Sequence, residues 1–172
     1  SQAAETVKLL ENTFRAVNIA LVYEFAQMCD KMNLDVWEII DAAATKPFGF
    51  MPFYPGPGLG GHCIPVDPHY LAWKARLHGH TPRFIDLASD INAAMPEYIV
   101  GKVVDCLNLN RLPINGSKIL MIGVTYKKDV ADLRESPAVE ILRNLQKKGG
   151  QIRYHDPIIP SLTVDEIYYQ SI

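Results

Sequence analysis

Residues 55–68 constrain the fold of this chain more than any other segment, because they concentrate residues with unusual backbone requirements. Four glycines and two prolines precede Cys63 within eight residues. Glycine permits φ > 0 and the close approach of other groups, whereas proline fixes φ and removes a hydrogen-bond donor. We therefore predict a bent, well-defined loop that presents the Cys63 thiol, followed four residues later by the Asp67 carboxylate.

Simpler interpretations of this segment remain open at this point. Many loops rich in glycine and proline are only connections, and a cysteine is commonly a small buried apolar residue. A reactive thiol needs solvent access and surroundings that favour its ionised form. His62 is adjacent in sequence, but neighbours in an extended segment point in opposite directions, so we expect no catalytic pair between His62 and Cys63.

Composition limits the classes of protein to be considered. A chain of 172 residues with 48% hydrophobic and 21% charged residues is typical of one or two soluble globular domains. A net charge of −2 does not indicate nucleic acid or an anionic membrane as a partner, and no apolar run approaches ~20 residues. The three cysteines are widely spaced and lack the paired spacing of metal ligands, so we expect no disulfide framework, no metal and a cytoplasmic location.

The first half of the chain is predicted to be helical, beginning with one long helix over residues 3–29. Lys8, Asn12 and Arg15 share one face of it, which indicates either a solvated flank or a cation and an amide ready for an anion or oxyanion. The helix contains no Gly or Pro and has an apolar row of the length found in oligomer interfaces, formed by Val7, Leu10, Phe14, Val17, Leu21, Phe25 and Met28.

Shorter helices are predicted after this one. They cover residues 36–44, with Asp35 as N-cap, residues 69–77, and residues 84–109, where Pro96 should kink or restart the helix. Residues 45–68 then form a loop of more than about 15 residues, which in a compact domain is usually functional or disordered. Its aromatic residues make it too apolar for disorder, so we expect it to line a site.

The pattern changes to α/β after residue 117. Residues 118–124 are a continuous apolar run, which predicts a strand buried on both faces. A helix opened by Ser136 and Pro137 and a second strand over residues 151–155 complete a βαβ unit. Residues 157–172 are not expected to complete this sheet.

This βαβ unit lacks one feature of a primary dinucleotide site. The G-x-G-x-x-G motif does not follow the first strand, although Asp156 at the end of the second strand could hold a ribose. Lys127, Lys128 and Arg134 follow the first strand, where α/β sheets bind ligands, so they are either phosphate contacts or solvated cations.

Three separated motifs resemble those of the UDP-glucose/GDP-mannose dehydrogenase family of nucleotide-sugar 6-dehydrogenases. They occupy residues 8–18, 60–68 and 126–137, and their order and spacing fit that family. The resemblance covers residues 4–160. Residues 46–58 look most like the branch that acts on UDP-N-acetylhexosamines, above all UDP-N-acetylglucosamine.

The resemblance implies an architecture. The family has an NAD-binding Rossmann domain, a long helical centre that forms the dimer, and a second Rossmann-like domain that helps to bind the nucleotide sugar. Residues 1–110 would be the mainly α central domain, and residues 117–172 part of the Rossmann-like domain. We expect the N-terminal NAD-binding domain to be absent from this chain, and a homodimer to form through the long first helix.

The resemblance also implies a double oxidation of the sugar C6 alcohol to a carboxylate, with two NAD. Cys63 resembles the nucleophile that takes the aldehyde as a thiohemiacetal, which a second hydride loss converts into a thioester for hydrolysis. Lys8 resembles the cation that stabilises the developing alkoxide, and Asn12 its amide partner. Asp67 resembles the carboxylate that orders water or takes protons.

Further positions match residues that bind the ligands in that family. Arg134 matches a position that reaches the NAD cofactor. The positions that match contacts to the UDP-sugar substrate are Tyr54, Gly58, Gly60, Tyr126 and Lys127.

Two other functions remain open. One is a non-catalytic helical module for dimerisation and nucleotide-sugar binding. The other is a cysteine hydrolase, which would need a histidine base near Cys63 that the sequence does not clearly offer. We expect this chain alone to be inactive as a dehydrogenase, because nothing in it can hold the nicotinamide.

Overall fold

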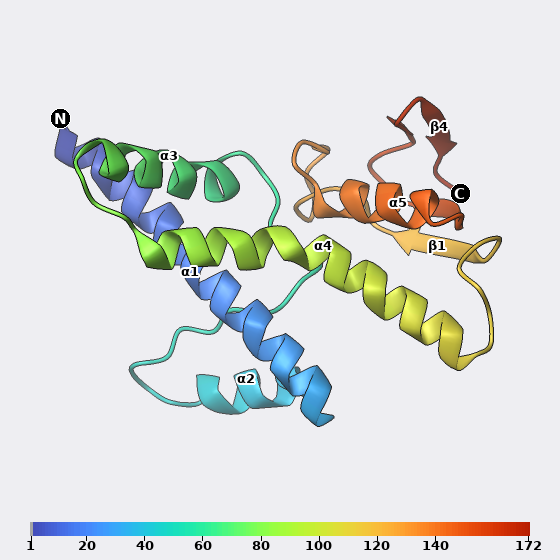
Figure 1. Ribbon diagram of the computed structural model, residues 1–172, viewed down its shortest axis with the longest axis horizontal. Helices are drawn as coiled ribbons and strands as arrows, with labels where there is room; N and C mark the ends of the chain where they lie inside the picture. The colour runs from blue at the N-terminus through green and yellow to red at the C-terminus, as the bar shows by residue number, and fades with distance from the viewer. Residues whose placement is uncertain (1) are drawn as a thin grey trace. The chain divides into compact units, whose positions relative to one another are not determined.

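The computed structural model of the protein describes residues 2–172, and the chain divides into two compact units. One unit contains the chain up to Gly56 together with Cys63–Ala93, and the other contains Pro57–His62 and Ala94–Ile172. The expectation of a mainly helical first part followed by a partial α/β part is confirmed (Figure 1).

The first unit is built on the long helix α1 (Gln2–Met32), which runs three residues beyond its predicted end. The helix α2 (Val36–Ala44) lies beside the C-terminal part of α1 (Figure 1). Asp35 caps α2 as predicted, because its side chain accepts hydrogen bonds from the backbone N–H of Trp37 at 2.8 Å and of Glu38 at 3.3 Å.

The third helix, α3 (Cys63–Leu77), begins six residues before its predicted start. Two prolines hid this start in the sequence. Pro65 lies in the first turn, where a helical N–H has no intrahelical acceptor, so it costs no hydrogen bond. Pro68 removes the N–H that would donate to the Ile64 carbonyl, yet the helix continues. The expectation of an extended backbone at Cys63 is therefore wrong.

The packing of α1 differs from the pattern of its large apolar residues. Its buried face contains small residues, among them Ala16 and Ala20, and the Asn92 amide of α4 (Arg83–Leu109) donates to the Ala16 carbonyl at 3.1 Å. Most of the predicted apolar row is instead exposed within this chain, namely Val7, Leu10, Phe14, Leu21 and Met28.

The helix α4 extends without interruption through Pro96, which is buried. Of the two outcomes expected at Pro96, a kink or a restart, the restart is wrong, because one missing N–H within 27 residues leaves the other backbone hydrogen bonds of the helix available. The residues of α4 up to Ala93 belong to the first unit, and those from Ala94 onward belong to the second.

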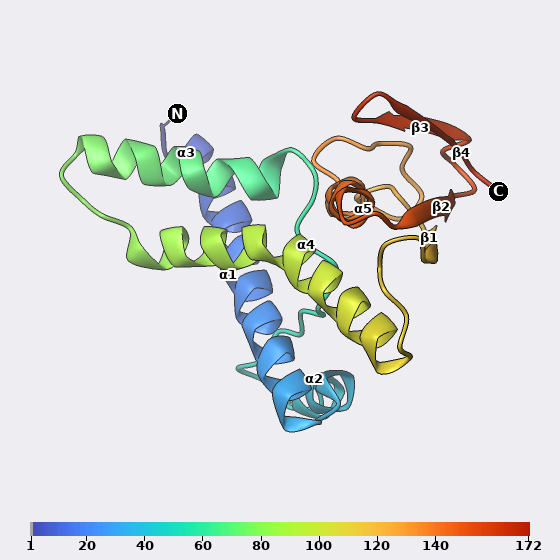
Figure 2. The same cartoon turned by 45° about the vertical axis from the view of Figure 1, so that its right-hand side comes forward.

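The second unit contains the predicted βαβ arrangement. Strand β1 (Lys118–Ile122) pairs in parallel with β2 (Gln151–His155), and α5 (Pro137–Lys147) connects them (Figure 2). The strands β3 (Ser161–Val164) and β4 (Ile167–Gln170) form a separate antiparallel pair. Residues 157–172 therefore do not complete the β1–β2 sheet, as expected, although Ser171 forms an isolated bridge with Tyr154 of β2.

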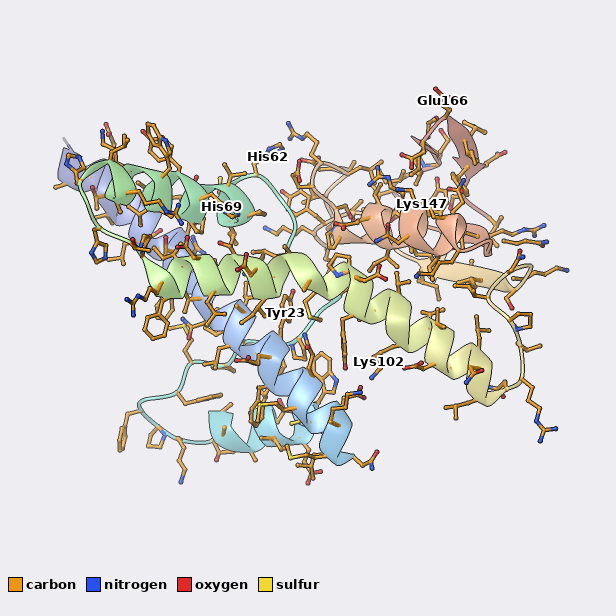
Figure 3. The ribbon with its side chains drawn as sticks, in the orientation of Figure 1. Tyr23, His62, His69, Lys102, Lys147 and Glu166 are labelled. Atoms are coloured by element: carbon orange, nitrogen blue, oxygen red, sulfur yellow. The ribbon has the colours of Figure 1, made fainter. Side chains whose placement is uncertain are left out.

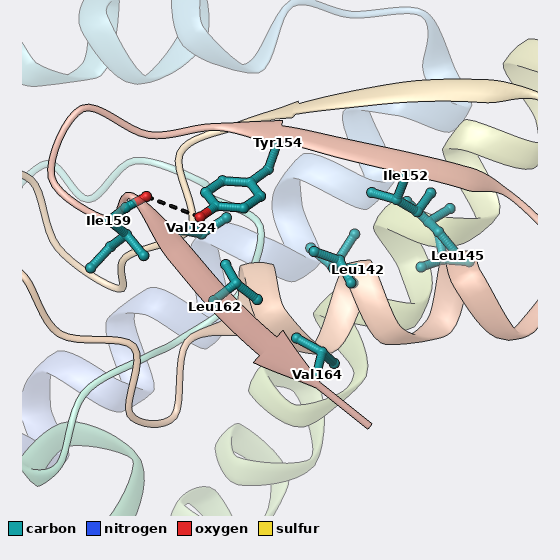
Figure 4. Close-up of a cluster of buried hydrophobic side chains, with 10 residues drawn as sticks. Val124, Leu142, Leu145, Ile152, Tyr154, Ile159, Leu162 and Val164 are labelled. Carbon is teal, nitrogen blue, oxygen red and sulfur yellow. Dashed lines mark hydrogen bonds between the residues drawn. The ribbon is translucent and has the colours of Figure 1, made fainter. Parts of the chain in front are cut away.

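The core of the second unit lies between α5, β2 and β3 (Figure 4). Leu142, Leu145 and Tyr154 are almost completely buried there, and the Tyr154 hydroxyl donates to the Ile159 carbonyl at 3.0 Å. The β1 residues Leu120 and Ile122, in contrast, are 53% and 80% exposed.

This exposure shows that the prediction of a strand buried on both faces is wrong for β1. Burial alternates along the strand, so one face is at least partly covered and the other is open. Ile119 and Met121, on the covered face, pack against the buried cluster. Within residues 2–172 the Leu120 and Ile122 side chains on the opposite face remain accessible to solvent.

Candidate active site

The free thiol of Cys63 is exposed, at the first residue of α3. Backbone N–H groups in the first turn of a helix lack intrahelical acceptors, and the helix dipole makes this end electropositive. Negative charge that develops on an oxygen bound next to the Cys63 sulfur would be stabilised there. Asp67 follows four residues later on the same helix, so Cys63 and Asp67 share one face.

Asn12 and Asp67 lie far apart in sequence and meet in the first unit. Asn12 of α1 donates from Nδ2 to Oδ2 of Asp67 in α3 at 2.5 Å. The Asn12 side chain is only 1% exposed, so water does not compete for this contact. A hydrogen bond thus connects two of the four predicted catalytic residues, Asn12 and Asp67, and Cys63 lies one turn from Asp67 on α3.

Lys8, the fourth predicted catalytic residue, lies one turn before Asn12 on α1. Its ammonium group is 3.7 Å from the Glu11 carboxylate, and both side chains are more than half exposed. Glu11 is also 3.9 Å from the Arg15 guanidinium. Lys8, Glu11, Asn12 and Arg15 thus form a polar face on α1, as the spacing of three of them predicts. Sequence reasoning assigned no individual role to Glu11 or Arg15.

The Tyr54 side chain packs against α2. Its ring stacks on Trp37 with centroids 5.7 Å apart and an interplanar angle of 14°, and its hydroxyl donates to Asp41 at 2.9 Å. That hydrogen bond is the main reason why the pKa of Tyr54 is raised above its usual value.

The long loop before the glycines also borders a cavity in the first unit. This cavity has a volume of ≈ 730 Å³. Its walls are mostly apolar side chains from α1, α2 and the loop, including Phe14, Phe25, Ile40, Phe50 and Phe53. The loop therefore lines a cavity, and the predicted catalytic residues are not among those that line it.

Gly58 and Gly60 are tightly packed in the second unit. A Cβ atom on Gly58 would lie 2.6 Å from Cβ of Pro137, and one on Gly60 would lie 2.6 Å from Cβ of Tyr126. The next residue, Gly61, has φ = +91° and would also bring a Cβ within 2.9 Å of the Tyr126 ring. These glycines are therefore needed for packing against Tyr126 and Pro137, whether or not a ligand also approaches them.

Arg134 is engaged by a neighbouring carboxylate. Its guanidinium donates to Asp132 through Nε at 2.9 Å and through a terminal nitrogen at 2.7 Å. These hydrogen bonds lower the pKa of Asp132 from its usual 3.8 to about 2. Lys127 is exposed, and its backbone carbonyl accepts a hydrogen bond from Thr125 at 3.0 Å. Sequence reasoning missed Asp132 as the partner of Arg134.

The histidine next to Cys63 also faces Asp132. His62 Nε2 lies 4.0 Å from Asp132 Oδ2. Figure 3 shows His62 on the connection that precedes α3, and His69 on α3 itself. The neighbour in sequence of the candidate nucleophile therefore pairs with a carboxylate in the second unit.

Asp156 has a structural role. Its carboxylate accepts hydrogen bonds from the backbone N–H of Val124 at 2.9 Å, Ile158 at 2.8 Å and Ile159 at 3.0 Å. Burial alone would raise the pKa of Asp156, but these N–H donors outweigh it and the pKa is lowered. The carboxylate is thus occupied in joining two loops, which argues against its holding a ribose.

The described residues do not form a dinucleotide cradle. The segment after β1 has no glycine-rich turn leading into a helix, and the acidic residue after β2 is saturated by backbone donors. The described residues therefore do not provide the main binding site for NAD. Across residues 2–172, no group of three or more His, Cys, Asp or Glu side chains is arranged to hold a metal ion. None of the described helices has the length and apolarity that crossing a bilayer requires.

Comparison with known proteins identifies the class. Residues 2–94 match the model of the UDP-glucose/GDP-mannose dehydrogenase family, central domain. Residues 120–171 match the UDP binding domain of the same family. The chain therefore belongs to the UDP-glucose/GDP-mannose dehydrogenase family, which confirms the resemblance seen in its motifs.

Individual relatives of this chain are named as dehydrogenases of UDP-N-acetyl sugars. The chain is 41% identical over 157 residues to UDP-N-acetyl-D-mannosamine dehydrogenase of Methanococcus maripaludis, and 39% identical over 156 residues to UDP-N-acetyl-D-glucosamine 6-dehydrogenase of Pseudomonas aeruginosa. These matches cover 91% of this chain but 35% and 36% of the relatives.

A solved structure with a similar name also resembles this chain in fold. The UDP-D-ManNAc dehydrogenase from Pyrococcus horikoshii superimposes with a TM-score of 0.85 at 35% identity, over 92% of this chain and 37% of that one. The chain thus spans little more than a third of the length of the relatives that it matches.

Proposed function

We propose that the complete gene product is an NAD-dependent 6-dehydrogenase of a UDP-N-acetylhexosamine. Residues 1–110 supply its helical central domain, and residues 117–172 supply part of its UDP-binding domain. The observation that carries this proposal is the hydrogen bond between Asn12 and Asp67, one helical turn from the exposed Cys63 thiol. It joins two residues of the proposed reaction, beside the third, within a chain of the UDP-glucose/GDP-mannose dehydrogenase family.

In the first half of the proposed reaction, the sugar C6 alcohol loses a proton and a hydride and becomes an aldehyde. When bound, NAD supplies the hydride acceptor for both oxidations. The Lys8 ammonium stabilises the alkoxide that forms as the proton leaves, and Asn12 donates a hydrogen bond to the same oxygen. The Cys63 sulfur then adds to the aldehyde carbon, and the carbonyl oxygen takes a proton to give a thiohemiacetal.

In the second half, the thiohemiacetal loses its hydroxyl proton and a hydride and becomes a thioester. Water attacks the thioester carbon, Asp67 accepts a proton from this water, and the C–S bond breaks as Asp67 returns that proton to the leaving sulfur. The products are the uronate and the Cys63 thiol. The contact between Asn12 and Asp67 supports this role, because it holds the Asp67 carboxylate one helical turn from Cys63.

The substrate is proposed to be a UDP-N-acetylhexosamine, with UDP-N-acetylglucosamine as the first candidate. The relatives described above are named for N-acetylmannosamine and N-acetylglucosamine. We assign contacts with the UDP-sugar to five residues, and Arg134 to the cofactor. Those five are Tyr54, Gly58, Gly60, Tyr126 and Lys127.

The working protein is proposed to be a cytoplasmic homodimer through α1. Support comes from Leu10 and Leu21, which are 64% and 63% exposed on this helix. Apolar side chains aligned along a long helix suit a helix–helix interface. Leu10→Glu with Leu21→Glu should convert the complete gene product to monomers in analytical ultracentrifugation. A variant that sediments as the wild-type dimer would contradict this interface.

The decisive test follows NADH formation by the complete gene product with a panel of UDP-sugars. We expect two NADH for each UDP-N-acetylglucosamine oxidised, and a loss of about 10³-fold or more in kcat for Cys63→Ser. Cys106→Ser is the matched control, because Cys106 is the other exposed free thiol among residues 2–172 and belongs to the second unit. It should leave turnover unchanged.

The same experiment separates the alternative functions. Tight binding of UDP-sugars without NADH formation would favour a non-catalytic binding module. Turnover that persists in Cys63→Ser would remove Cys63 as the nucleophile while leaving the dehydrogenase class in place.

A further inference from the structure

Arg15 makes a contact that the proposed reaction does not yet use. Its guanidinium donates to Oδ1 of Asn12 at 2.5 Å, three residues earlier on α1. The other end of the Asn12 amide is also engaged, because its Nδ2 donates to Asp67. Arg15, Asn12 and Asp67 therefore form a continuous hydrogen-bonded chain within the first unit.

The chemistry of the three groups allows only one orientation of the amide between them. A guanidinium can only donate hydrogen bonds, and an ionised carboxylate can only accept them. The Asn12 oxygen must therefore face Arg15, and the Asn12 nitrogen must face Asp67. If the amide were flipped, its oxygen would face the Asp67 carboxylate and its N–H groups would face the guanidinium.

Burial makes this orientation important. The Asn12 side chain is 1% exposed, so water cannot readily replace a lost partner, and an unpaired buried amide group is costly. The Arg15 side chain is 40% exposed, and its guanidinium lies 3.9 Å from the Glu11 carboxylate. The same terminal nitrogen of Arg15 thus contacts both the Asn12 oxygen and the Glu11 carboxylate.

We propose that Arg15 is a positioning residue for the Asn12–Asp67 pair. The inference rests on the proposed dehydrogenase function. Arg15 fixes the end of the Asn12 amide that faces Asp67, and this keeps the Asp67 carboxylate in place one turn from Cys63. Removing the guanidinium releases the amide, so the carboxylate that accepts the proton from water is no longer held. The main loss should appear in kcat and not in substrate binding.

The test compares Arg15→Met and Arg15→Lys in the complete gene product, with UDP-N-acetylglucosamine and NAD. A misplaced catalytic group can cost about 10²-fold, so Arg15→Met should lower kcat by about that factor and leave KM within about threefold. Arg15→Lys keeps a donor of the same charge and should recover about tenfold of that loss. A residue that only stabilised the fold would not divide its effect between kcat and KM in this way.

Arg76→Met is the matched control. Arg76 also donates a hydrogen bond from its guanidinium, to Asp86 at 2.6 Å in the same unit, but it has no role in the proposed site. We expect its kcat and KM to match those of the wild type.

A second comparison tests whether Arg15 acts through Asn12. Arg15→Met should cause no further loss of kcat in an Asn12→Ala background, because residues in one hydrogen-bonded chain show non-additive effects. If Arg15→Met does not fold, Arg15→Lys replaces it in both comparisons. Its kcat is then compared with that of the same protein carrying Arg15, once in the wild-type background and once in the Asn12→Ala background.

Three results would overturn the inference while leaving the proposed function intact. They are wild-type turnover with unchanged kcat in Arg15→Met, a loss confined to KM, and a full additional loss in the Asn12→Ala background. Absence of NADH formation by the wild type with every UDP-sugar would contradict the proposed function and this inference together.

Discussion

The two units of the molecule bury different kinds of side chain. The second unit encloses a cluster of ten buried apolar residues, led by Leu142, Leu145 and Tyr154. The first unit buries small residues such as Ala16 beside the polar side chains of Asn12 and Asn92, and leaves large apolar side chains of α1 in solvent. The second unit is thus organised around its apolar core, whereas the first combines buried polar contacts with a row of exposed apolar side chains on α1.

Leu142→Ala should produce the largest effect on stability and would sharpen this comparison. Leu142 is 0% exposed in the apolar cluster, so its truncation should lower the free energy of unfolding by about 2–5 kcal/mol. Urea denaturation of the complete gene product measures the change. Leu109→Ala, at a residue 84% exposed on α4, is the control and should stay within about 0.5 kcal/mol of wild type. A loss below about 1 kcal/mol for Leu142→Ala would show that this cluster does not dominate the unit.

Asp156→Asn should cost about 2–3 kcal/mol at neutral pH, because three backbone N–H groups lose a charged acceptor. Since its folded pKa lies below the ordinary 3.8, the ionised carboxylate stabilises the fold fully above pH 3.8. That contribution is lost as the pH falls from there through the folded pKa.

Urea denaturation from neutral pH to about pH 3 should therefore show a smaller acid-side loss in Asp156→Asn than in wild type. Asp165→Asn is the control, because Asp165 pairs with Arg143 at 2.9 Å on the surface and should contribute about 0–1 kcal/mol. Equal acid-side slopes in wild type and Asp156→Asn would contradict the structural role of this carboxylate.

Gly60→Ala tests the packing of the glycine loop. The new methyl group would meet Tyr126 at 2.6 Å and the Glu135 carbonyl at 2.9 Å, so we expect a loss of about 1–3 kcal/mol by thermal denaturation. Gly101→Ala is the matched control, because a Cβ at this α4 position meets nothing within 4 Å. It should stabilise the helix by about 0.5–1 kcal/mol. Tolerance of both substitutions would mean that the loop packs less tightly than these distances imply.

Asn92→Ala should have the smallest effect of the four, about 1 kcal/mol. It removes the hydrogen bond to the Ala16 carbonyl, but it also removes Oδ1, a buried acceptor without a partner among the described residues. Thermal denaturation measures the change, with Asn144→Ala at an exposed 3.4 Å contact as the control. A loss above about 3 kcal/mol would show that buried polar contacts matter as much in the first unit as apolar burial does in the second.

The sequence predicted those elements whose signals are local. The Asp35 cap fixed the start of α2, and the alternation of strand, helix and strand gave the parallel pairing of β1 and β2. The spacing of Lys8, Asn12 and Arg15 indicated a shared face, which the contact between Asn12 and Arg15 bears out.

The features that sequence reasoning missed depend on tertiary structure. Two prolines obscured the start of α3, because a proline in a first turn cannot be distinguished from a loop proline without knowing the backbone. The exposed face of β1 could not be foreseen, since a continuous apolar run carries no information about which elements cover it. The hydrogen bond from Asn12 to Asp67 joins residues 55 positions apart, and periodicity does not report such a distance.

The tight packing of Gly58, Gly60 and Gly61 has a consequence for how this family evolves. These glycines are needed to seat the loop against Pro137 and Tyr126, so we expect them to be kept even in a relative that has lost the reaction. The Cys63 thiol, in contrast, is exposed, whereas Asp67 also accepts the hydrogen bond of the buried Asn12 amide. A descendant that kept the fold and abandoned the oxidation would therefore retain its glycines and change its thiol. Under the proposed mechanism, the thiol would therefore separate working enzymes from inactive copies better than the glycines would.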